Sequence, residues 1–266
     1  MKIGFLGSGK MAEAILSGIL QSELAAPEDV TACDKSEERL VLMRDKYGVA
    51  ATADAAEMIK CSDVIVLAVK PQDMKELLGG LNSLFTADHL LISIAAGKKL
   101  EFLRETCGDV PRLVRVMPNL ALMAQEGMSA FCMDGDGTEA DRTVTSQIFG
   151  SAGAVLELGE EHFDAVTALS GSGPAFVAYL LKGFVDGAVK LGIEEGAARL
   201  LAEQTMLGTA VYLQESGRDI GGFIQAVCSP KGTTEAGMNV ISSSDVAQVL
   251  EKTLTAAATR SRELSV

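Results

Sequence analysis

Short apolar runs alternate with helix-period segments along the first part of the chain. The apolar runs predict strands at 2–7, 30–34, 63–69, 90–96 and 112–117. The segments between them have the 3.6-residue period of amphipathic helices, at 10–22, 36–46, 71–85 and 99–107. Because runs such as 63–69 are apolar on consecutive positions, we expect strands that are covered on both faces. The pattern predicts an α/β fold with a doubly wound, mostly parallel sheet.

The pattern changes near residue 160. Two less regular strands are predicted at 128–133 and 153–158, around a helix at 138–150. Beyond them the strand signal stops and only helical segments follow, at 161–169, 174–191, 194–215, 219–227, 233–240 and 245–263. The segment 174–191 is apolar on nearly every face, which is typical of the centre of a bundle or of a subunit interface. We therefore expect two domains, 1–160 and 161–266, of which the second is all-helical and is completed by another copy of the chain.

A glycine-rich turn follows the first predicted strand. The loop comprises Gly7, Ser8, Gly9, Lys10 and Met11, and with Ala12 it matches the pattern G-x-G-x-x-A. The first glycine permits a tight turn, the second lets the backbone approach a pyrophosphate, and the small third residue lets the helix pack closely on the strand. The N–H groups at the start of the helix then face the diphosphate. Because the motif lies between a strand and a helix, it predicts a dinucleotide site in a Rossmann-type domain.

Asp34 and Lys35, at the end of the second predicted strand, leave the identity of the dinucleotide open. A carboxylate at this place typically binds the ribose hydroxyls of NAD(H) and repels a 2′-phosphate. Lys35 and Ser36 follow it directly and could instead hold the 2′-phosphate of NADP(H). We expect both Asp34 and Lys35 to bind the cofactor, whether it is NADP(H) or NAD(H).

Composition and charge narrow the classes of function. Apolar residues make up 48% and charged residues 22%, as in ordinary globular proteins. The formal net charge of −13 argues against nucleic acid as a partner. The apolar stretch 173–181 is too short to span a membrane, and the first residues lack the apolar core of a signal peptide. Five scattered cysteines without CxxC spacing are typical of reduced thiols. We expect a cytoplasmic protein that binds a small-molecule substrate, with no metal, membrane or nucleic acid as a partner.

A proton donor for hydride chemistry is missing from the motifs. His89 and His162 are the only histidines, and we interpret both as surface or packing residues. The β-hydroxyacid dehydrogenases share this domain layout, but Val177 occupies the position of their catalytic lysine. The reduction of an imine that binds already protonated does not need such a donor, because the enzyme need only orient the substrate and hydrogen-bond to it.

Two turns rich in hydroxyl groups and glycine could hold such a substrate. They are SGSGP at 170–174 and SPKGTT at 229–234, and each precedes a predicted helix. Free N–H groups at a helix start can bind a carboxylate. Each turn could equally be a plain N-cap, in which Ser or Thr satisfies the amides of its own helix.

The chain resembles the pyrroline-5-carboxylate reductases from end to end. The shared segments are IGFLGSGKMAEAI at 3–15, AVKP at 68–71, SIAAG at 93–97, RVMPN at 115–119, ALSGSGPAFV at 168–177 and SPKGTT at 229–234. The resemblance implies a dinucleotide-binding domain, a helical dimerisation and substrate-binding domain, and a homodimer, with an assembly of dimers as an alternative. It also implies that NADPH or NADH reduces 1-pyrroline-5-carboxylate to L-proline, the last step of proline biosynthesis.

The resemblance further implies the residues of the site. The nicotinamide half of the cofactor would be lined by Lys70, Pro71, Ala95, Ala96, Pro118 and Asn119. The cofactor would also be bound by the neighbouring residues Ala68, Val69 and Gly97. The substrate carboxylate and ring nitrogen would be held by Ser170, Gly232, Thr233 and Thr234. Thr234 would be the catalytic residue, hydrogen-bonding or donating a proton to the ring nitrogen.

Three positions depart from the pattern of the family. Leu120 breaks the usual MPNTPA segment, and Ala55 replaces an asparagine that commonly contacts the cofactor. Lys231 replaces the first glycine of SPGGTT, where it could bind the carboxylate or point to solvent. Two alternatives stay open: a reductase of another cyclic imine or of a small oxo acid, and a non-catalytic dinucleotide-binding paralogue.

Overall fold

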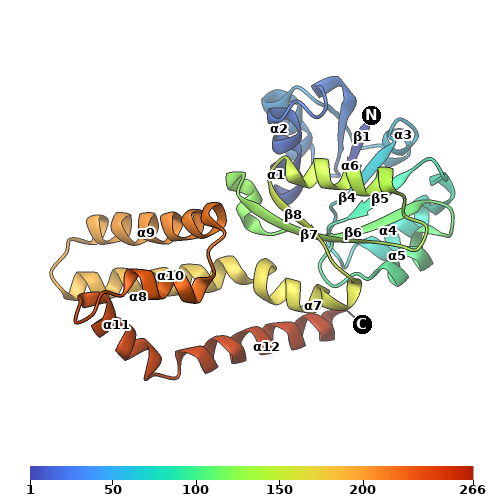
Figure 1. Ribbon diagram of the computed structural model, residues 1–266. Coiled ribbons are helices and arrows are strands. Elements are labelled where there is room, and N and C mark those ends of the chain that lie inside the picture. Colours follow the sequence, from blue (N-terminus) through green and yellow to red (C-terminus); the bar gives the residue numbers. More distant parts are fainter. Residues whose placement is uncertain (266) are drawn as a thin grey trace. The chain divides into compact units, whose positions relative to one another are not determined.

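The computed structural model describes residues 1–265 and divides into two compact units (Figure 1). The first unit runs from Met1 to Ser172 and also includes the residues from Ala257 onward. The second unit is Gly173–Ala256. The sequence alone places a boundary at residue 160, whereas the compact units meet between Ser172 and Gly173.

The first unit is built on an eight-stranded sheet with the strand order β3-β2-β1-β4-β5-β6-β7-β8. Neighbouring strands are parallel except β6 and β7. The strands are β1 (Ile3–Leu6), β2 (Val30–Cys33), β3 (Ala50–Thr52), β4 (Val64–Leu67), β5 (Leu90–Ser93), β6 (Arg112–Met117), β7 (Gly127–Met133) and β8 (Gly153–Glu157). The predicted doubly wound, mostly parallel sheet is confirmed.

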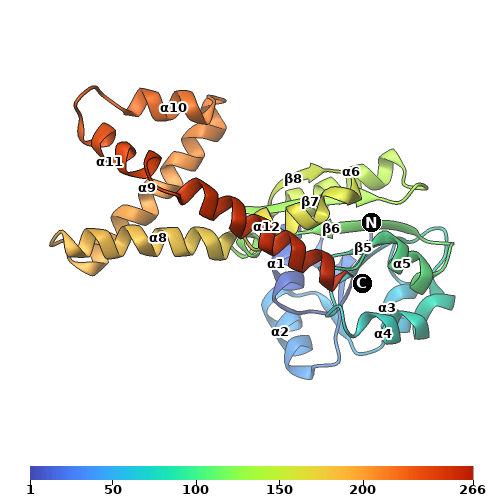
Figure 2. The ribbon, with the colours of Figure 1, turned by 90° about the horizontal axis from the view of Figure 1, so that it is seen from below.

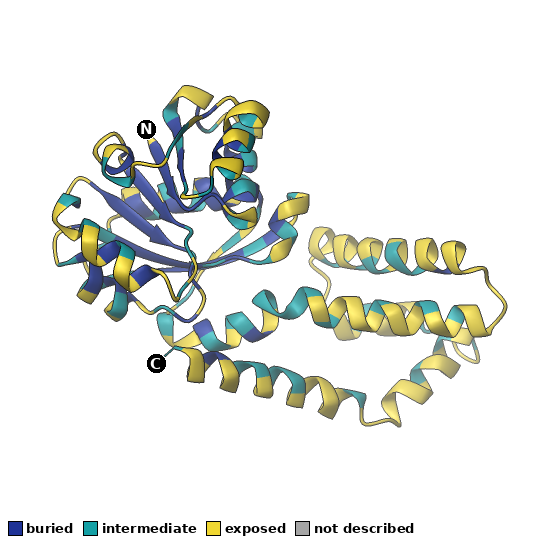
Figure 3. Ribbon diagram, turned by 180° about the vertical axis from the view of Figure 1, so that it is seen from behind, coloured by how far each residue is buried: buried dark blue, intermediate teal, exposed yellow. Residues whose placement is uncertain are grey.

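Helices cover both faces of this sheet. One face packs against α1 (Lys10–Gln21), α2 (Glu37–Tyr47) and α6 (Glu139–Gly150), and the other against α3 (Ala55–Lys60), α4 (Met74–Leu81) and α5 (Leu100–Cys107). Side chains alternate between the two cores, so that Val64 and Val66 lie in one and Ile65 and Leu67 in the other. This double burial explains why the strands are apolar on consecutive positions. The inner strands are accordingly buried along their length (Figure 3).

Two elements of the first unit escape prediction from the sequence. The edge strand β3 has three residues, Ala-Ala-Thr, which carry almost no β-forming signal. The six-residue helix α3 is too short to show a helical period. Several predicted strands are also too long, because apolar residues such as Val69 and Ile94 continue into the loops beyond the hydrogen-bonded ladder.

Short helical turns complete the first unit. The 3₁₀ turns are Pro27–Asp29, Asn82–Leu84, Leu120–Ala124 and Glu160–His162. The short helix α7 (Phe163–Val166) then passes directly into a π-helical segment, Thr167–Gly171. The expected turn at 170–174 is therefore wrong. Ser170 and Gly171 lie in helical backbone, where the N–H of Ser172 donates to the carbonyl of Thr167 at 2.8 Å.

The second unit is all-helical, as predicted. It contains α8 (Gly173–Lys190), α9 (Glu195–Ser216), α10 (Ile220–Val227), α11 (Thr233–Ser242) and the first part of α12 (Val246–Leu264). Figure 2 shows these helices, coloured from yellow-orange (α8) to red (α12). Among residues 1–265, no helix combines the length and the apolar character that crossing a bilayer requires.

The helices of the second unit leave a large apolar surface uncovered. None of the residues of α8 is buried (Figure 3). Tyr179 and Phe184 expose 78% and 63% of their surface. Between α8 and α9 lies a groove of about 630 Å³, lined mainly by apolar residues that include Val177, Leu180 and Met206. A surface of this kind is typical of an interface with another protein.

The five cysteines are all free thiols, and Cys33, Cys107 and Cys132 are buried in the first unit. These three buried cysteines belong to one of the two hydrophobic cores of the sheet. They therefore serve as separate packing residues of that core.

Glu13 joins α1 to α2. Its carboxylate accepts hydrogen bonds from Arg39 (2.8 Å), Lys46 (3.0 Å) and the Tyr47 hydroxyl (2.9 Å). Burial opposes the ionisation of Glu13, but these three donors outweigh it and lower the pKa of the carboxyl to about 2. Because the pKa is depressed in the folded state, Glu13 stabilises the fold fully above its ordinary pKa of 4.5 and progressively less as the pH falls towards 2.

We expect Glu13→Gln to make stability less sensitive to acid. The urea midpoint of the wild type should fall between about pH 5 and about pH 3 by more than that of the variant, because only the wild type has this carboxylate to protonate. Glu28→Gln, at an exposed carboxyl of the same unit, is the matched control and should follow the wild type. Equal acid sensitivity of wild type and Glu13→Gln would show that the ionisation of Glu13 is not coupled to stability.

Candidate active site

The glycine-rich loop is held tightly between three strands. Gly7 has φ +98°, and its N–H donates to the carbonyl of Cys33 on β2 at 2.8 Å. A Cβ atom on Gly7 would lie 2.7 Å from the carbonyl oxygen of Ala68, just after β4. Both the positive φ and this close approach require glycine. Helix α1 then begins at Lys10, with Gly9 as its N-cap, so that its first N–H groups face the edge where the strands end.

Asp34 braces this loop. One carboxylate oxygen accepts from the N–H of Ser8 (2.7 Å) and from its hydroxyl (3.0 Å), and the other accepts from the N–H of Ser36 (3.0 Å). Burial opposes ionisation, but these hydrogen bonds and the charge of Arg39 outweigh it and lower the pKa of Asp34 below its ordinary value. A carboxylate offers about four lone-pair positions, so most of the capacity of Asp34 is already used inside the protein.

Arg39 is a residue of this region that the sequence analysis missed. It lies in the first turn of α2, and its Nε donates to the carbonyl of Ser8 at 2.7 Å. Its guanidinium therefore lies beside both the glycine-rich loop and Asp34, and it keeps further N–H donors for a ligand. Lys35, which directly follows Asp34 in the sequence, is exposed. The only sequence signal for Arg39 is a cation in the first turn after Asp34, which is where an arginine can accommodate a 2′-phosphate.

The other predicted cofactor residues gather along one edge of the sheet. Ala68–Pro71 follow β4, Ala95–Gly97 follow β5, and Pro118–Asn119 follow β6. Because these strands are parallel neighbours, the loops leave the sheet at the same edge as the glycine-rich loop. The strand order reverses between β1 and β4, and ligands of doubly wound sheets bind at such a point.

Asn119 connects two predicted parts of the site. Its side-chain oxygen accepts from the N–H groups of Ala121 (3.2 Å) and Met128 (3.1 Å), which fixes the loop after β6. Its amide nitrogen donates to the hydroxyl of Ser170 at 3.4 Å. The structure thus brings one predicted cofactor residue and one predicted substrate residue into contact.

The second hydroxyl-rich turn lies in the second unit. Gly232 is the N-cap of α11, and Thr233 and Thr234 occupy its first turn. Lys231 has φ +62°, which is unusual for a residue other than glycine, and its N–H donates to the Glu235 carboxylate at 2.8 Å. Gly232, Thr233 and Thr234 are therefore contiguous with one another, in a different unit from Ser170.

Neither histidine lies among these residues. His89 is buried just before β5, at the opposite end of that strand from Ala95, and its Nδ1 accepts from the N–H of Thr86 at 2.9 Å. Burial lowers the pKa of His89, so it packs as a neutral ring. His162 is exposed beside Glu161. Among residues 1–265 there is also no group of three or more His, Cys, Asp or Glu side chains that could hold a metal ion.

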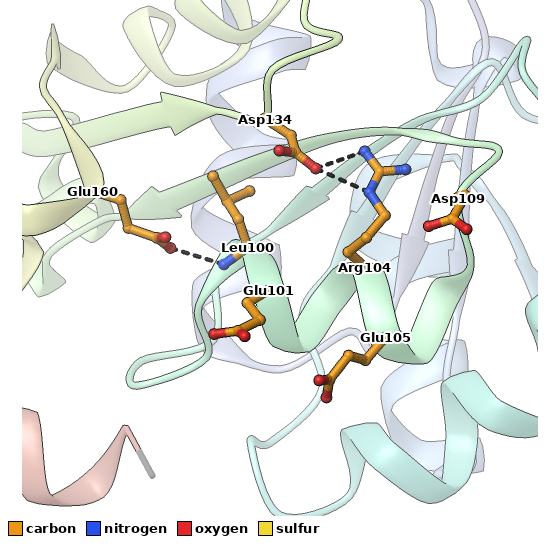
Figure 4. A pocket seen from close by; sticks show the side chains of 7 residues that line it. All are labelled: Leu100, Glu101, Arg104, Glu105, Asp109, Asp134 and Glu160. Carbon is orange, nitrogen blue, oxygen red and sulfur yellow. Dashed lines mark hydrogen bonds and ion pairs between the residues drawn. The ribbon is translucent and has the colours of Figure 1, made fainter.

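A pocket of about 410 Å³ beside α5 contains none of the predicted site residues (Figure 4). It is lined by Leu100, Glu101, Arg104, Glu105, Asp109, Asp134 and Glu160. Arg104 spans it and pairs with Asp134 at 2.6 Å and with Asp136 at 3.1 Å. The only basic residue of the lining, Arg104, is thus already paired with acidic residues of the protein.

Two family models match this chain, one in its N-terminal part and one in its C-terminal part. A family model described as pyrroline-5-carboxylate reductase dimerisation matches residues 160–264. A second model, described as NADP oxidoreductase coenzyme F420-dependent, matches residues 2–97.

Individual relatives match over nearly the whole chain. The pyrroline-5-carboxylate reductase of Arabidopsis thaliana is 37% identical over 99% of this chain and 95% of its own length. That of Methanosarcina acetivorans is 36% identical over 99% and 97%.

Solved structures agree in fold. A pyrroline-5-carboxylate reductase from Coxiella burnetii has a TM-score of 0.95 at 31% identity, covering 100% of this chain and 98% of that one. A pyrroline carboxylate reductase from Plasmodium falciparum, solved with NADP bound, has a TM-score of 0.88 at 26% identity, covering 100% and 98%. The resemblance seen in the sequence is confirmed, and the chain belongs to the pyrroline-5-carboxylate reductase family.

Proposed function

We propose that this protein reduces 1-pyrroline-5-carboxylate to L-proline, by hydride transfer from NAD(P)H to the imine carbon, in the cytoplasm and as the last step of proline biosynthesis. The observation that carries the proposal is full-length identity of more than 35% to named pyrroline-5-carboxylate reductases. The arrangement of the dinucleotide loops at the switch point of the sheet supports it independently. No metal is needed for this reaction.

The glycine-rich loop fits a dinucleotide diphosphate. Gly7, Ser8, Gly9, Lys10 and Met11 would hold the diphosphate, with the N–H groups at the start of α1 directed at it. Asp34, Lys35 and Arg39 would surround the adenosine ribose. Arg39 binds Glu13 and the Ser8 carbonyl but keeps further guanidinium N–H groups, and Lys35 adds a second cation. Asp34 has little capacity left for the ribose hydroxyls, so this region favours NADP(H) over NAD(H).

The loops after β4, β5 and β6 would line the nicotinamide half of the cofactor. When bound, the reduced nicotinamide supplies the hydride. The residues assigned here are Ala68, Val69, Lys70, Pro71, Ala95, Ala96, Gly97, Pro118 and Asn119. Most of their side chains are small or apolar, so they orient the ring and exclude water rather than exchange protons.

Ser170, Gly232, Thr233 and Thr234 would bind the substrate. The N–H groups at the start of α11 would hold its carboxylate, and the Thr234 hydroxyl would hydrogen-bond to the ring nitrogen. The imine nitrogen then carries its own proton into the reaction as an iminium, and the hydride completes the amine. No histidine or lysine base is required in this scheme, which agrees with the positions of His89 and His162 away from the site.

The apolar surface of α8 and α9 would be covered by a second copy of the chain. The dimerisation model spans 160–264 and so includes both helices. The groove between them is lined mainly by apolar residues, which are stabilised when water is removed from them. The assembly would therefore be a homodimer, or a larger assembly of such dimers.

Substrate specificity is tested directly by turnover. Oxidation of NADPH should be fast with 1-pyrroline-5-carboxylate, and slow or absent with a six-membered cyclic imine carboxylate or a small oxo acid, measured by the absorbance of the reduced nicotinamide. A preference for either of the other substrates would identify a related reductase instead. NADPH binding without turnover of any substrate would identify a non-catalytic paralogue.

Cofactor choice should respond to Lys35 and Arg39. Replacing either by alanine should lower the ratio of kcat/KM for NADPH to that for NADH by about tenfold, the effect of one lost charged hydrogen bond. Asp34→Ser should raise that ratio and lower both values, because Asp34 also braces the loop. Arg44→Ala, at the other end of α2, is the control and should leave the ratio unchanged. A ratio unaffected by all three substitutions would place 2′-phosphate recognition elsewhere.

Assembly should fail when a charge is placed in the groove. Leu180→Asp and Phe184→Asp should give monomeric or insoluble protein, since each would bury an unpaired carboxylate in the interface. Val110→Asp, at an exposed apolar position of the first unit, should assemble normally. Light scattering over a range of concentrations measures the mass. A wild type that is monomeric and fully active at every concentration would contradict the proposed interface.

Catalysis should depend on Thr234 and on neither histidine. Thr234→Ala should lower kcat by about 5–150-fold, which corresponds to about 1–3 kcal/mol for one lost contact, while the Kd for NADPH stays near that of the wild type. Thr234→Ser, which keeps the hydroxyl, should recover most of the rate. His89→Ala and His162→Ala should change kcat by less than about threefold. An inactive histidine variant beside a fully active Thr234→Ala would refute the iminium scheme.

A further inference from the structure

The last turn of α12 belongs to the first unit and lies against the loop that follows β5. The carbonyl oxygen of Leu264 is 3.1 Å from the position that a Cβ atom would occupy on Gly97, and the Ser265 hydroxyl is 3.7 Å from it. Gly97 is buried and has φ +75°. The backbone conformation thus favours glycine, and the carbonyl of Leu264 leaves little room for a side chain.

This turn is anchored by a partly buried hydrogen bond. The Ser261 side chain is almost fully buried, at 6% exposure, and its hydroxyl donates to Asp164 Oδ1 on α7 at 2.7 Å. Arg262 lies 3.7 Å from the other oxygen of the same carboxylate. The Ser265 hydroxyl donates to the carbonyl of Ser261 at 2.9 Å, which continues the turn towards Gly97. A continuous series of contacts therefore links Asp164, through the last turn of α12, to Gly97.

The far end of the same loop is held by Glu160. One oxygen of Glu160 accepts from the N–H of Leu100, the first residue of α5, at 2.8 Å, and Figure 4 shows this hydrogen bond. The same oxygen accepts from Arg115 on β6 at 2.9 Å. Arg115 is buried, and its guanidinium lies 4.6 Å from the centre of the Phe163 ring. The loop is thus fixed between β5, Glu160 and the last turn of α12.

We propose that the last turn of α12, Ser261–Ser265, is a positioning element for the nicotinamide loop. Ser261 and Gly97 are its positioning residues: Ser261 anchors the turn, and Gly97 receives it. The inference rests on the proposed function, which assigns Ala95–Gly97 to the nicotinamide half of the cofactor. Without the anchor the loop loses the carbonyl that packs against Gly97, so the nicotinamide end is held less firmly, while the loop around Gly7–Met11 is untouched.

The test separates the two ends of the cofactor. Titration calorimetry gives the Kd of the wild type, Ser261→Ala and Gly97→Ala for NADPH and for 2′,5′-ADP, which carries the phosphorylated adenosine but no nicotinamide. For each variant we expect the Kd for NADPH to rise by about fivefold, as for one lost hydrogen bond, and the Kd for 2′,5′-ADP to stay within about twofold. In the double variant the two effects should combine to less than their product, since both act through one loop.

Two matched controls exclude general destabilisation. Gly108→Ala is at the other end of α5, where φ is +85° and no atom lies within 4 Å of an added Cβ, so it carries the backbone strain without the contact. Thr143→Ala removes an exposed hydroxyl on α6 that bonds only to its own helix. Both should bind NADPH like the wild type.

Failure of this inference is distinct from failure of the proposed function. Equal weakening of NADPH and 2′,5′-ADP, or an NADPH affinity unchanged by Ser261→Ala, would overturn the positioning role even in an active reductase. The expected difference between the two ligands would support it even in a chain that does not turn over 1-pyrroline-5-carboxylate. A wild type that binds no NADPH would overturn both.

Discussion

Four neighbouring parallel strands end at the same level, and the whole ligand edge of the first unit depends on this register. Cys33, Leu6, Leu67 and Ser93 are the last residues of β2, β1, β4 and β5, and each is paired with the next across the sheet. The loops that follow therefore leave the sheet side by side. A slip of one residue in any strand would displace its loop by about 3.3 Å and turn every side chain of that strand to the other face. The backbone ladder aligns the site, and the loops can consist largely of glycine, alanine and proline.

Side-chain oxygens then bind backbone N–H groups of the segments at and around this edge of the sheet. Asp34 holds the N–H of Ser8, Glu160 holds that of Leu100, and Asn119 holds that of Met128. In each case the oxygen comes from a different part of the chain from the amide that it binds. Such bonds satisfy donors that would otherwise be unpaired next to a ligand site, and they reduce the conformational freedom that binding has to remove.

The local pattern of apolar and polar residues predicts most of the helices and strands, but it does not show which distant residues come into contact. The strands around 64–67 and 112–117 and the helices of the second unit follow from apolar runs and periods, because burial on known faces generates those patterns. The short β3 and α3 have too few residues to generate one. The π-helical segment Thr167–Gly171 extends into the predicted turn at 170–174, because the serine and glycine residues at its end also suit turns.

The residues of the candidate site likewise fall into those that a local motif predicts and those that only long-range contacts reveal. The glycine-rich loop could be predicted from a motif whose spacing reflects its own geometry. Arg39 and Glu160 could not, since their partners Ser8 and Leu100 lie 31 and 60 positions away. No local rule links residues at such separations. The apolar faces of α8 and α9 are exposed in a single chain. The role of the second unit therefore depends on a partner that the sequence of one chain does not identify.

The buried thiols have a consequence for the chemical durability of the protein. Burial raises the pKa of Cys33 to about 11 and that of Cys107 and Cys132 to about 12. At neutral pH about one Cys33 side chain in ten thousand is then a thiolate, the form that reacts with peroxides and alkylating agents. The carbonyl of Cys33 also accepts a hydrogen bond from the N–H of Gly7, so an adduct on Cys33 would distort the glycine-rich loop. The apolar packing that aligns the strands thereby also shields the base of the dinucleotide site from oxidative damage.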